Sequence, residues 1–301
     1  IGNSAFLNAT SLTSINIPAS VTSIGSGAFQ NTTALVSVTV DGANPSYSST
    51  SGVLFNKNST TLIAYPLGKN NTFYAIPTSV TSIGDGAFEG ATSVTRVTFA
   101  SGSQLARIPS SAFRNATLLT FITIPESVTS IGSSAFYNAT ALPSITIPAG
   151  VTSIGSQAFR DATALTSIVI PASVTSIGSS AFYEATMLNS VYFLGNAPTI
   201  GDSAFGSVAS GAQVIVKDEA NDFGNEGDTW QGLVVSISPI DATYLCSTGK
   251  LSDVGTTYTI NSGVVTDGSS CTGAVVIPAG ATSICDSAFY NATSLTSINI
   301  P

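Results

Sequence analysis

Few side chains in this sequence could carry out chemistry, and their types exclude most enzyme mechanisms. The chain contains no His, which removes Ser-His-Asp and Cys-His constellations and nearly all catalytic zinc sites. It also lacks the glycine-rich phosphate-binding sequences and the Gly-x-Ser-x-Gly sequence of hydrolases. Carboxylates are the only groups left for acid or base work. We therefore predict that the protein is not an enzyme and needs no cofactor.

The acidic residues form one cluster, in the sequence KDEANDFGNEGD that begins at Lys217. Carboxylate oxygens on a glycine-rich loop suit Ca²⁺, and the candidate ligands are Asp218, Asp222, Glu226 and Asp228. The residue order of an EF-hand fails, because Ala220 stands at its third position and Phe223 stands where Gly belongs. A solvated capping loop explains the same charges without a metal, and we prefer that interpretation.

Three cysteines allow at most one intramolecular disulfide. Cys246 and Cys271 bracket one segment and could join it in an oxidising compartment, whereas Cys285 lies within a repeated motif. The rival interpretation is three reduced, buried thiols. We expect the Cys246–Cys271 bond, because the rest of the composition resembles that of a surface protein.

Seven Asn-x-Ser/Thr sequons could accept N-linked glycans in a suitable organism. They begin at Asn8, Asn31, Asn58, Asn70, Asn115, Asn138 and Asn291. Five of them occupy one column of the repeat, two residues after a Phe, and the same column holds Gly90, Asp161 and Glu184. A turn position that prefers small polar residues accounts for this column without glycosylation.

These residues are positioned by a sequence repeat that fills most of the chain. Ile124 recurs as Ile147 and Ile170, 23 residues apart each time, and each copy carries Val-Thr-Ser-Ile-Gly and Ala-Phe at the same places. A fixed period of this size indicates stacked supersecondary units. The alternation in Leu142–Ile147 predicts a strand with Ile145 and Ile147 inward and the residues between them outward.

The full pattern, Leu-x-x-Ile-x-Ile-Pro-x-x-Val-Thr-Ser-Ile-Gly-x-x-Ala-Phe, resembles the leucine-rich repeats of the BspA-like type. The match covers 1–237 and 275–301. One departure is that the family's frequent Cys is Ala here, as at Ala139. The resemblance implies a repeat solenoid of 23-residue units, mostly β with short turns or 3₁₀ segments, in a bacterial or protozoan surface protein.

The repeat phase divides the chain into four parts. We predict a leucine-rich repeat array over 1–193 with a hairpin insert at 41–75, then degenerate capping repeats over 194–238. A junction segment follows over 239–273, and a second array begins at 274–301. Within the capping part, we expect the single Trp to close the end of the first array.

The outward strand positions are the candidate contact surface. They form two rows that consist mainly of Ser and Thr: Ser14, Ser37, Arg96, Phe121, Ser144, Ser167, Ser190 and Ser297, beside Asn16, Thr39, Thr98, Thr123, Thr146, Val169, Tyr192 and Asn299. Such hydroxyl rows could match an ordered lattice such as ice, but Arg96, Phe121 and Tyr192 interrupt them. Arg and aromatic side chains anchor protein interfaces, so these three residues are our candidates for a protein contact.

The charge and the apolar content of the sequence reduce the classes of binding partner that we expect. The net charge is −8 with an isoelectric point near 4.2, and only eight Lys and Arg are present, which disfavours nucleic acid. No apolar run approaches the roughly 18 residues of a membrane helix. We expect an extracellular or cell-surface scaffold for adhesion that binds proteins or glycans.

The alternative function is a structural one, a segment of a filament or stalk that self-associates end to end. Ile1 stands in the repeat where Ile24 stands, and Pro301 stands where Pro18 stands. This phase predicts that the solenoid continues past both ends, or that copies dock head to tail.

Overall fold

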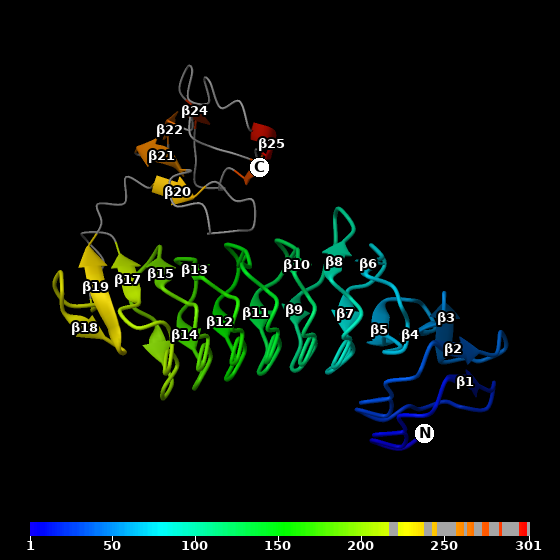
Figure 1. Ribbon diagram of the computed structural model, residues 1–301. Helices are drawn as coiled ribbons and strands as arrows, with labels where there is room; N and C mark the ends of the chain where they lie inside the picture. Colours follow the sequence, from blue (N-terminus) through cyan, green and yellow to red (C-terminus); the bar gives the residue numbers. More distant parts are fainter. Residues whose placement is uncertain are drawn as a thin grey trace.

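The computed structural model describes residues 1–216 and 222–237 with their side chains, and beyond them the backbone of six strands (Figure 1). These six are β20 (Thr243–Leu245), β21 (Thr257–Asn261), β22 (Val264–Asp267), β23 (Gly273–Val276), β24 (Ser283–Ile284) and β25 (Leu295–Asn299). Several predicted features lie outside the described residues, namely those that involve Asp218, Cys246, Cys271, Cys285, Asn291 and Pro301. The expected disulfide and the division of the chain after residue 238 stay predictions.

Each repeat forms one coil of a β-solenoid, and the coils stack along one axis (Figure 1). A coil has a longer strand on its first side, a two-residue strand on its second side and a turn segment on its third. The described residues contain no helix. We name each coil after the aromatic residue of its turn segment, in the order Phe6, Phe29, Tyr65, Phe88, Phe113, Phe136, Phe159, Phe182 and Phe205.

The first side consists of parallel strands that pair in register. Ser14 lies beside Ser37, and Ser167 lies beside Ser190, so each coil advances the chain by one repeat. The strands are β1 (Ser14–Ile17), β2 (Ser37–Val40), β6 (Phe73–Ile76), β8 (Arg96–Phe99), β10 (Phe121–Ile122), β13 (Ser167–Ile170), β15 (Ser190–Phe193), β17 (Gln213–Val216) and β19 (Leu233–Ile237).

One coil departs from this pattern. The sequence predicts a strand over Leu142–Ile147, and the structure assigns none there, so the first side splits into separate sheets. Pro143 supplies the physical reason, since it lacks the N–H with which Thr120 and Thr166 donate to the preceding coil. The predicted facing holds nevertheless, because Ile145 and Ile147 are buried and Thr146 is exposed.

The second side also pairs in parallel, with Ile131 beside Ile154 and Ile154 beside Ile177. Each Ile points into the core and the preceding Ser is half-buried, which is the alternation expected of a strand with one buried face. The strands are β7 (Ser82–Ile83), β9 (Arg107–Ile108), β11 (Ser130–Ile131), β12 (Ser153–Ile154), β14 (Ser176–Ile177) and β16 (Thr199–Ile200).

The turn segments form a hydrogen-bonded ladder of their own. In the Phe136 coil, the N–H groups of Ser134, Phe136 and Asn138 donate to carbonyls of the next coil at 2.7–2.9 Å. The N–H groups between them donate three residues back within the same turn. Ser134 and Asn138 have φ of 54° and 57°, a left-handed conformation that Asn tolerates better than most residues. This backbone requirement explains the small polar column that contains the sequons.

The core is an aromatic stack flanked by aliphatic side chains. Phe113, Phe136, Phe159, Phe182 and Phe205 stack with 5.1–5.4 Å between ring centroids and at most 7° between ring planes. Because the repeat places each ring directly above the previous one, every coil buries its neighbour's ring as well as its own. A coil therefore gains most of its stability from the coils on either side.

The stack is interrupted near the N-terminal end. Phe6 stacks on Phe29, and the main stack begins at Tyr65, so the buried residues fall into two clusters. Tyr65 is only 3% exposed, and its hydroxyl has no hydrogen-bond partner in the described chain. Burial raises the pKa of Tyr65 to about 12, and burial, then the nearby Tyr65, raise the pKa of Tyr74 further.

The insert at 41–75 separates the two clusters. The sequence predicts a hairpin there, and β4 (Val53–Asn56) does pair antiparallel with β5 (Thr61–Ala64). The structure adds β3 (Tyr47–Thr50) on the other edge and pairs β5 parallel with β7, so β5 becomes a rung of the solenoid. Asn44, fully buried, ties the insert down by donating to the Pro18 and Val21 carbonyls and accepting two backbone N–H groups.

At the C-terminal end of the described coils, β19 continues the first side beside β17, and β18 (Thr229–Trp230) turns back antiparallel to it. The Trp230 ring packs against Phe193, Phe205 and Phe223 with centroid distances of 4.7–6.2 Å. These aromatic contacts cover the end of the stack where the sequence places its capping residue.

We predict that Phe136→Ala lowers the free energy of unfolding by about 3–5 kcal/mol, because it removes a fully buried ring from the middle of the stack. Thr146→Ala, on the exposed side of the same repeat, should cost less than about 0.5 kcal/mol. Urea melts followed by circular dichroism measure both, and equal losses would contradict the assignment of inner and outer faces.

A second prediction concerns the buried hydroxyl. Tyr65→Phe restores the ring that most coils carry and removes an unpartnered polar group, so it should stabilise the fold by about 1 kcal/mol. The folded pKa of Tyr65 lies above its ordinary value of 10.0, so the wild type keeps its stability below about pH 10 and loses it as the pH rises toward 12. The variant should lose less over that interval in denaturant melts at pH 8 and pH 11. An equal or larger loss would refute this explanation.

Candidate interaction surfaces

One exposed patch joins aromatic and arginine side chains on three neighbouring strands. Phe73 on β6 lies beside Arg96 on β8, and Arg96 lies beside Phe121 on β10. The Arg96 guanidinium lies 4.4 Å from the centroid of the Phe121 ring. Phe73 is 50% exposed and Phe121 is 39% exposed. We call these three residues the Phe-Arg-Phe patch.

The patch has the chemistry of a protein contact. Aromatic and Arg side chains are enriched at the energetic centres of interfaces, and Arg96 already covers one ring and so keeps its guanidinium in a fixed place. The strands beneath it are held by the solenoid ladder. A partner would therefore meet a preorganised surface, which reduces the entropy lost on binding.

The column of outward residues in the sequence identifies Arg96 and Phe121 as contact candidates, and the structure adds Phe73 to them. The signal was present, since Phe73 stands three residues before Ile76 just as Ser14 stands three residues before Ile17. Ile76 keeps the phase of the repeat after the insert, and the structure accordingly pairs β6 directly with β8.

Tyr192 does not join the Phe-Arg-Phe patch. It lies on β15, three coils beyond β10, between Val169 and Ile215 in the neighbouring strands. Burial raises the pKa of Tyr192, and a hydrogen bond with Ser190 opposes that rise. Tyr192 is half-buried, so its ring contributes to packing on the outer face as well as to the surface.

The outward Ser and Thr rows are exposed or half-buried, with one exception among the described residues. Ser167 is 8% exposed, but the alternation along β13 keeps it on the outward face, because Ile168 and Ile170 are the inward residues. Val169, on the same face, is 38% exposed.

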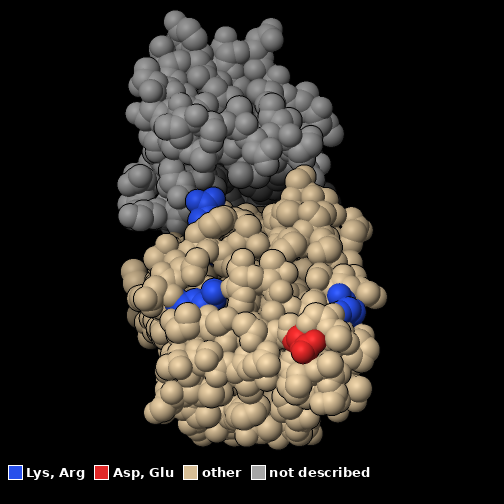
Figure 2. Space-filling model, turned by 90° about the vertical axis from the view of Figure 1, so that its right-hand side faces the viewer, with Lys and Arg blue, Asp and Glu red and all other residues tan. Residues whose placement is uncertain are grey.

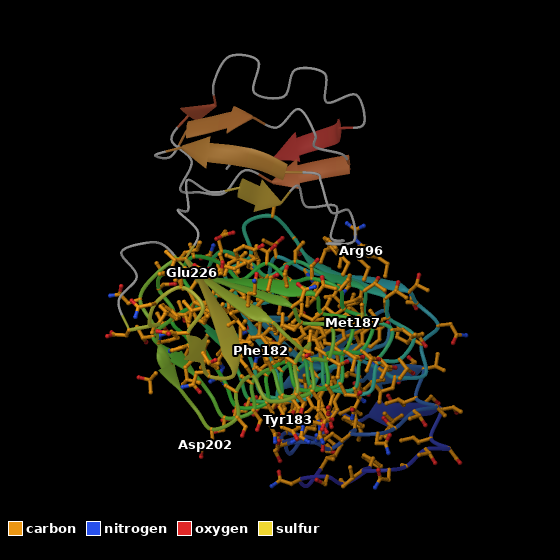
Figure 3. All side chains as sticks on the ribbon, turned by 60° about the vertical axis from the view of Figure 1, so that its left-hand side comes forward. Arg96, Phe182, Tyr183, Met187, Asp202 and Glu226 are labelled. Atoms are coloured by element: carbon orange, nitrogen blue, oxygen red, sulfur yellow. The ribbon has the colours of Figure 1, made fainter. Side chains whose placement is uncertain are left out.

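A second row of polar side chains follows the turn segments, and the sequence analysis did not recognise it. Each member stands one residue after a stacked Phe, so the repeat places them in a line on the outside. The Arg114 guanidinium lies 5.0 Å from the Tyr137 ring, and Arg160 lies 4.9 Å from the Tyr183 ring and 5.9 Å from Tyr137. In Figure 3, Phe182 lies within the coils whereas Tyr183 lies at their lower rim. We call this line the Arg-Tyr row.

The N-terminal continuation of the Arg-Tyr row is ionic and polar. Glu89 contacts Arg114 at 3.4 Å and accepts a 2.6 Å hydrogen bond from the Gln30 amide. Gly206 continues the row past Tyr183, and a Cβ there would lie 2.7 Å from the Tyr183 ring. A glycine is therefore required at that position for Tyr183 to keep its place.

Two described members of the acidic cluster accept hydrogen bonds from the backbone. Glu226 accepts a short hydrogen bond from the Ile237 N–H, and Asp228 accepts one from the Asn225 N–H at 2.7 Å. Asp222 has a φ of 78°. No group of three or more acidic, Cys or His side chains in the part of the chain that is described could hold a metal ion. The calcium site remains an untested prediction, because Asp218 is not described.

Four described sequons lie in the left-handed turn column, and their amides form pairs. The Asn31 amide donates to the Asn8 side chain at 2.7 Å, and the Asn138 amide donates to Asn115 at 3.1 Å. Asn58 and Asn70 are exposed outside this column. Glycosylation would require the amide nitrogen of the acceptor, so Asn31 and Asn138 are less suitable acceptors than Asn58 or Asn70.

The Arg-Tyr row gives a prediction about stability. Tyr137 lies between two guanidinium groups, each worth about 0.5–1 kcal/mol at an exposed site, so Tyr137→Ala should lower the free energy of unfolding by about 1–2 kcal/mol. Tyr137→Phe keeps the ring face and should stay within about 0.5 kcal/mol of wild type. Melts in 1 M salt as well as low salt measure both variants. An equal cost for Phe and Ala would show that the hydroxyl, not the ring, matters.

Solved structures of bacterial proteins share this architecture. A leucine rich cell surface protein from Faecalibacterium prausnitzii is 34% identical with a TM-score of 0.56, over 62% of this chain and 48% of that one. A leucine-rich repeat protein from Eubacterium ventriosum is 28% identical with a TM-score of 0.53, over 66% and 59%. The pneumococcal vaccine antigen PcpA is 22% identical with a TM-score of 0.62, over 75% and 56%, and shows the fold alone.

The match thus spans about half to three-fifths of the length of these proteins. No curated protein sequence matches the chain. Among the described residues, none belongs to a helix with the length and hydrophobicity needed to span a membrane. A family model for the BspA type leucine rich repeat region matches residues 1–102, 64–118, 106–226 and 259–301. The chain therefore belongs to the BspA-type leucine-rich repeat family.

Proposed function

We propose that this protein is a non-enzymatic, surface-displayed scaffold that binds another protein through the Phe-Arg-Phe patch. The observation that carries the proposal is the exposure of two aromatic rings beside a fixed guanidinium on the rigid first side of the solenoid. Exposing aromatic side chains to water costs free energy, and a partner that covers the two rings would recover that free energy.

The family supports the coarse part of this proposal. Leucine-rich repeat domains are scaffolds for protein interaction, and the F. prausnitzii relative is described as a cell surface protein. A surface location would also suit the expected Cys246–Cys271 bond, since disulfides persist in oxidising compartments. Adhesion would then be the consequence of displaying the patch on a cell.

The patch favours a protein over a glycan. Sugars bind aromatic residues by stacking on the ring face, and the Arg96 guanidinium already lies over the Phe121 ring. Charged residues make up only 8% of the chain, and Figure 2 shows a few separate charged groups on the N-terminal end of the solenoid. Hydrophobic contact at the two rings, with one cation for orientation, matches the centre of a protein interface.

Two other expected functions receive less support. An ice-binding surface needs long uninterrupted rows, and the patch stands in the middle of them. Self-association into a filament or stalk stays a prediction, and a second copy of the chain is one partner that the following experiment would detect.

The test compares wild type with the double variant Phe73→Ser/Phe121→Ser, using Thr39→Ser on the same face as the matched control. A photoreactive phenylalanine analogue at position 98 in each protein would be crosslinked on intact bacterial surfaces and the products identified by mass spectrometry. Binding of the identified protein is then measured by calorimetry.

We expect the double variant to weaken binding at least tenfold, because residues at interface centres contribute about 2 kcal/mol or more each. Thr39→Ser should bind as tightly as wild type. Unchanged binding by a correctly folded double variant would refute the patch as the contact surface.

A further inference from the structure

A cleft opens where the insert shortens one turn of the solenoid. Leu62 on β5 pairs with Ile83 on β7, but Tyr65 follows Leu62 after three residues, whereas Phe88 follows Ile83 after five. The turn segment of the Tyr65 coil is therefore two residues shorter than its neighbours. The turn segments of the Phe29 and Phe88 coils therefore face each other across a gap that the short turn of the Tyr65 coil does not fill.

The resulting cavity has a volume of about 230 Å³. Its walls are the turn of the Phe29 coil (residues 24–30) and the turn of the Phe88 coil (residues 84–89), and its floor is residues 63–67. Water occupies roughly 30 Å³ per molecule in the liquid, so the cleft has room for several water molecules. A peptide backbone that replaces them would leave its larger side chains outside the cleft. It also coincides with the boundary between the two buried clusters.

One wall presents backbone donors that the ladder leaves unused. In the Phe136 coil, Ser134 and Phe136 donate their N–H groups to the next coil at 2.9 and 2.7 Å. Gly27 and Phe29 hold the same two positions in the Phe29 coil, and Gly27 has the same left-handed backbone, with φ of 64°. Neither N–H makes a hydrogen bond within the described chain.

The opposite wall presents unused backbone acceptors. In the Phe113 coil, the carbonyls of Ser110 and Arg114 accept from the preceding coil at 3.0 and 2.8 Å. Asp85 and Glu89 hold the same positions in the Phe88 coil, and neither carbonyl accepts a bond from the described residues. Only Ala87, between them, is used, by the Tyr65 N–H at 2.9 Å. The cleft thus has donors on one side and acceptors on the other.

The charge of the cleft is negative. Its lining includes the Asp85 and Glu89 side chains and no Lys or Arg. The Gln30 amide crosses the opening to the Glu89 carboxylate at 2.6 Å, so a ligand must displace or pass this contact. Neutral or cationic ligands are favoured over acidic ones.

We propose that this cleft binds a short peptide segment by its backbone, as the missing rung of the turn ladder. A polypeptide carries an N–H and a C=O on each residue, so one segment can accept from Gly27 and Phe29 and donate to Asp85 and Glu89. This is the principle by which extended peptides add to sheet edges. The site is separate from the Phe-Arg-Phe patch, and the proposal holds or fails independently of it.

The probe is the peptide acetyl-Ser-Ala-Phe-Tyr-Asn-amide, which has the sequence of a complete turn of this chain at residues 134–138. It is titrated into the full ¹⁵N-labelled chain. Binding in the cleft should shift the amide resonances of Gly27 and Phe29 downfield and leave those of Ser134 and Phe136 unchanged. A control peptide N-methylated at Ser and Asn, the residues that match the ladder donors Ser134 and Asn138, loses the amide donors for Asp85 and Glu89, and should bind about five- to tenfold more weakly for each donor lost. The same peptide with Glu in place of Tyr should also bind more weakly.

A protein variant provides the second arm. Ala64→Phe places a ring on the floor of the cleft and should abolish the shifts, whereas Ala43→Phe, on an exposed part of the insert outside the cleft, should not. Wild-type protein whose Gly27 and Phe29 resonances do not move at millimolar peptide would overturn the proposal. So would N-methylated peptide that binds as well as the unmodified one.

Discussion

The structure depends on one constraint, that each coil must satisfy the backbone hydrogen bonds of the next. The strands of the first and second sides pair in register with a repeat of 23 residues, and the turn segments form a third ladder through alternate N–H groups. Unpaired backbone groups inside a protein are costly, so a change in repeat length is accommodated only where the pairing between coils is kept, as between the Phe88 and Phe113 coils. The fixed period also aligns the Phe rings into one stack.

The insert is the place where this constraint is broken. It pairs β5 with the second side but shortens the turn before Tyr65. The consequences are local and connected: the aromatic stack is interrupted, the buried residues divide into two clusters, a buried hydroxyl finds no partner among the described residues, and a cleft forms between two turns. A regular solenoid has a nearly uniform surface, so an irregular coil is where a specific ligand site can arise.

The outward side chains are the ones that differ most from one repeat of this chain to the next. Inward positions are restricted to Ile, Val, Leu, Ala and Phe by packing between coils, with Tyr65 as an exception in the main cluster, whereas outward positions are free to vary. At fixed spacing, side chains of neighbouring coils meet in lines, as in the Arg-Tyr row and the Phe-Arg-Phe patch. Residues far apart in the sequence thereby form one surface on a rigid support.

The sequence alone determined the fold class, the inward and outward faces and the turn column, because each follows from a period that one copy shares with the next. It also identified Arg96 and Phe121, which differ from the Ser of their column. Phe73 could have been found from the phase that it shares with Ser14, but the cleft could not, since it depends on how β5 re-enters the array after the insert, a choice made by hydrogen bonding between coils. Nor did the sequence reveal the Arg-Tyr row, in which rings and guanidinium groups stack only because their coils do. Tertiary structure decided these features, because they are contacts between coils and no single repeat contains them.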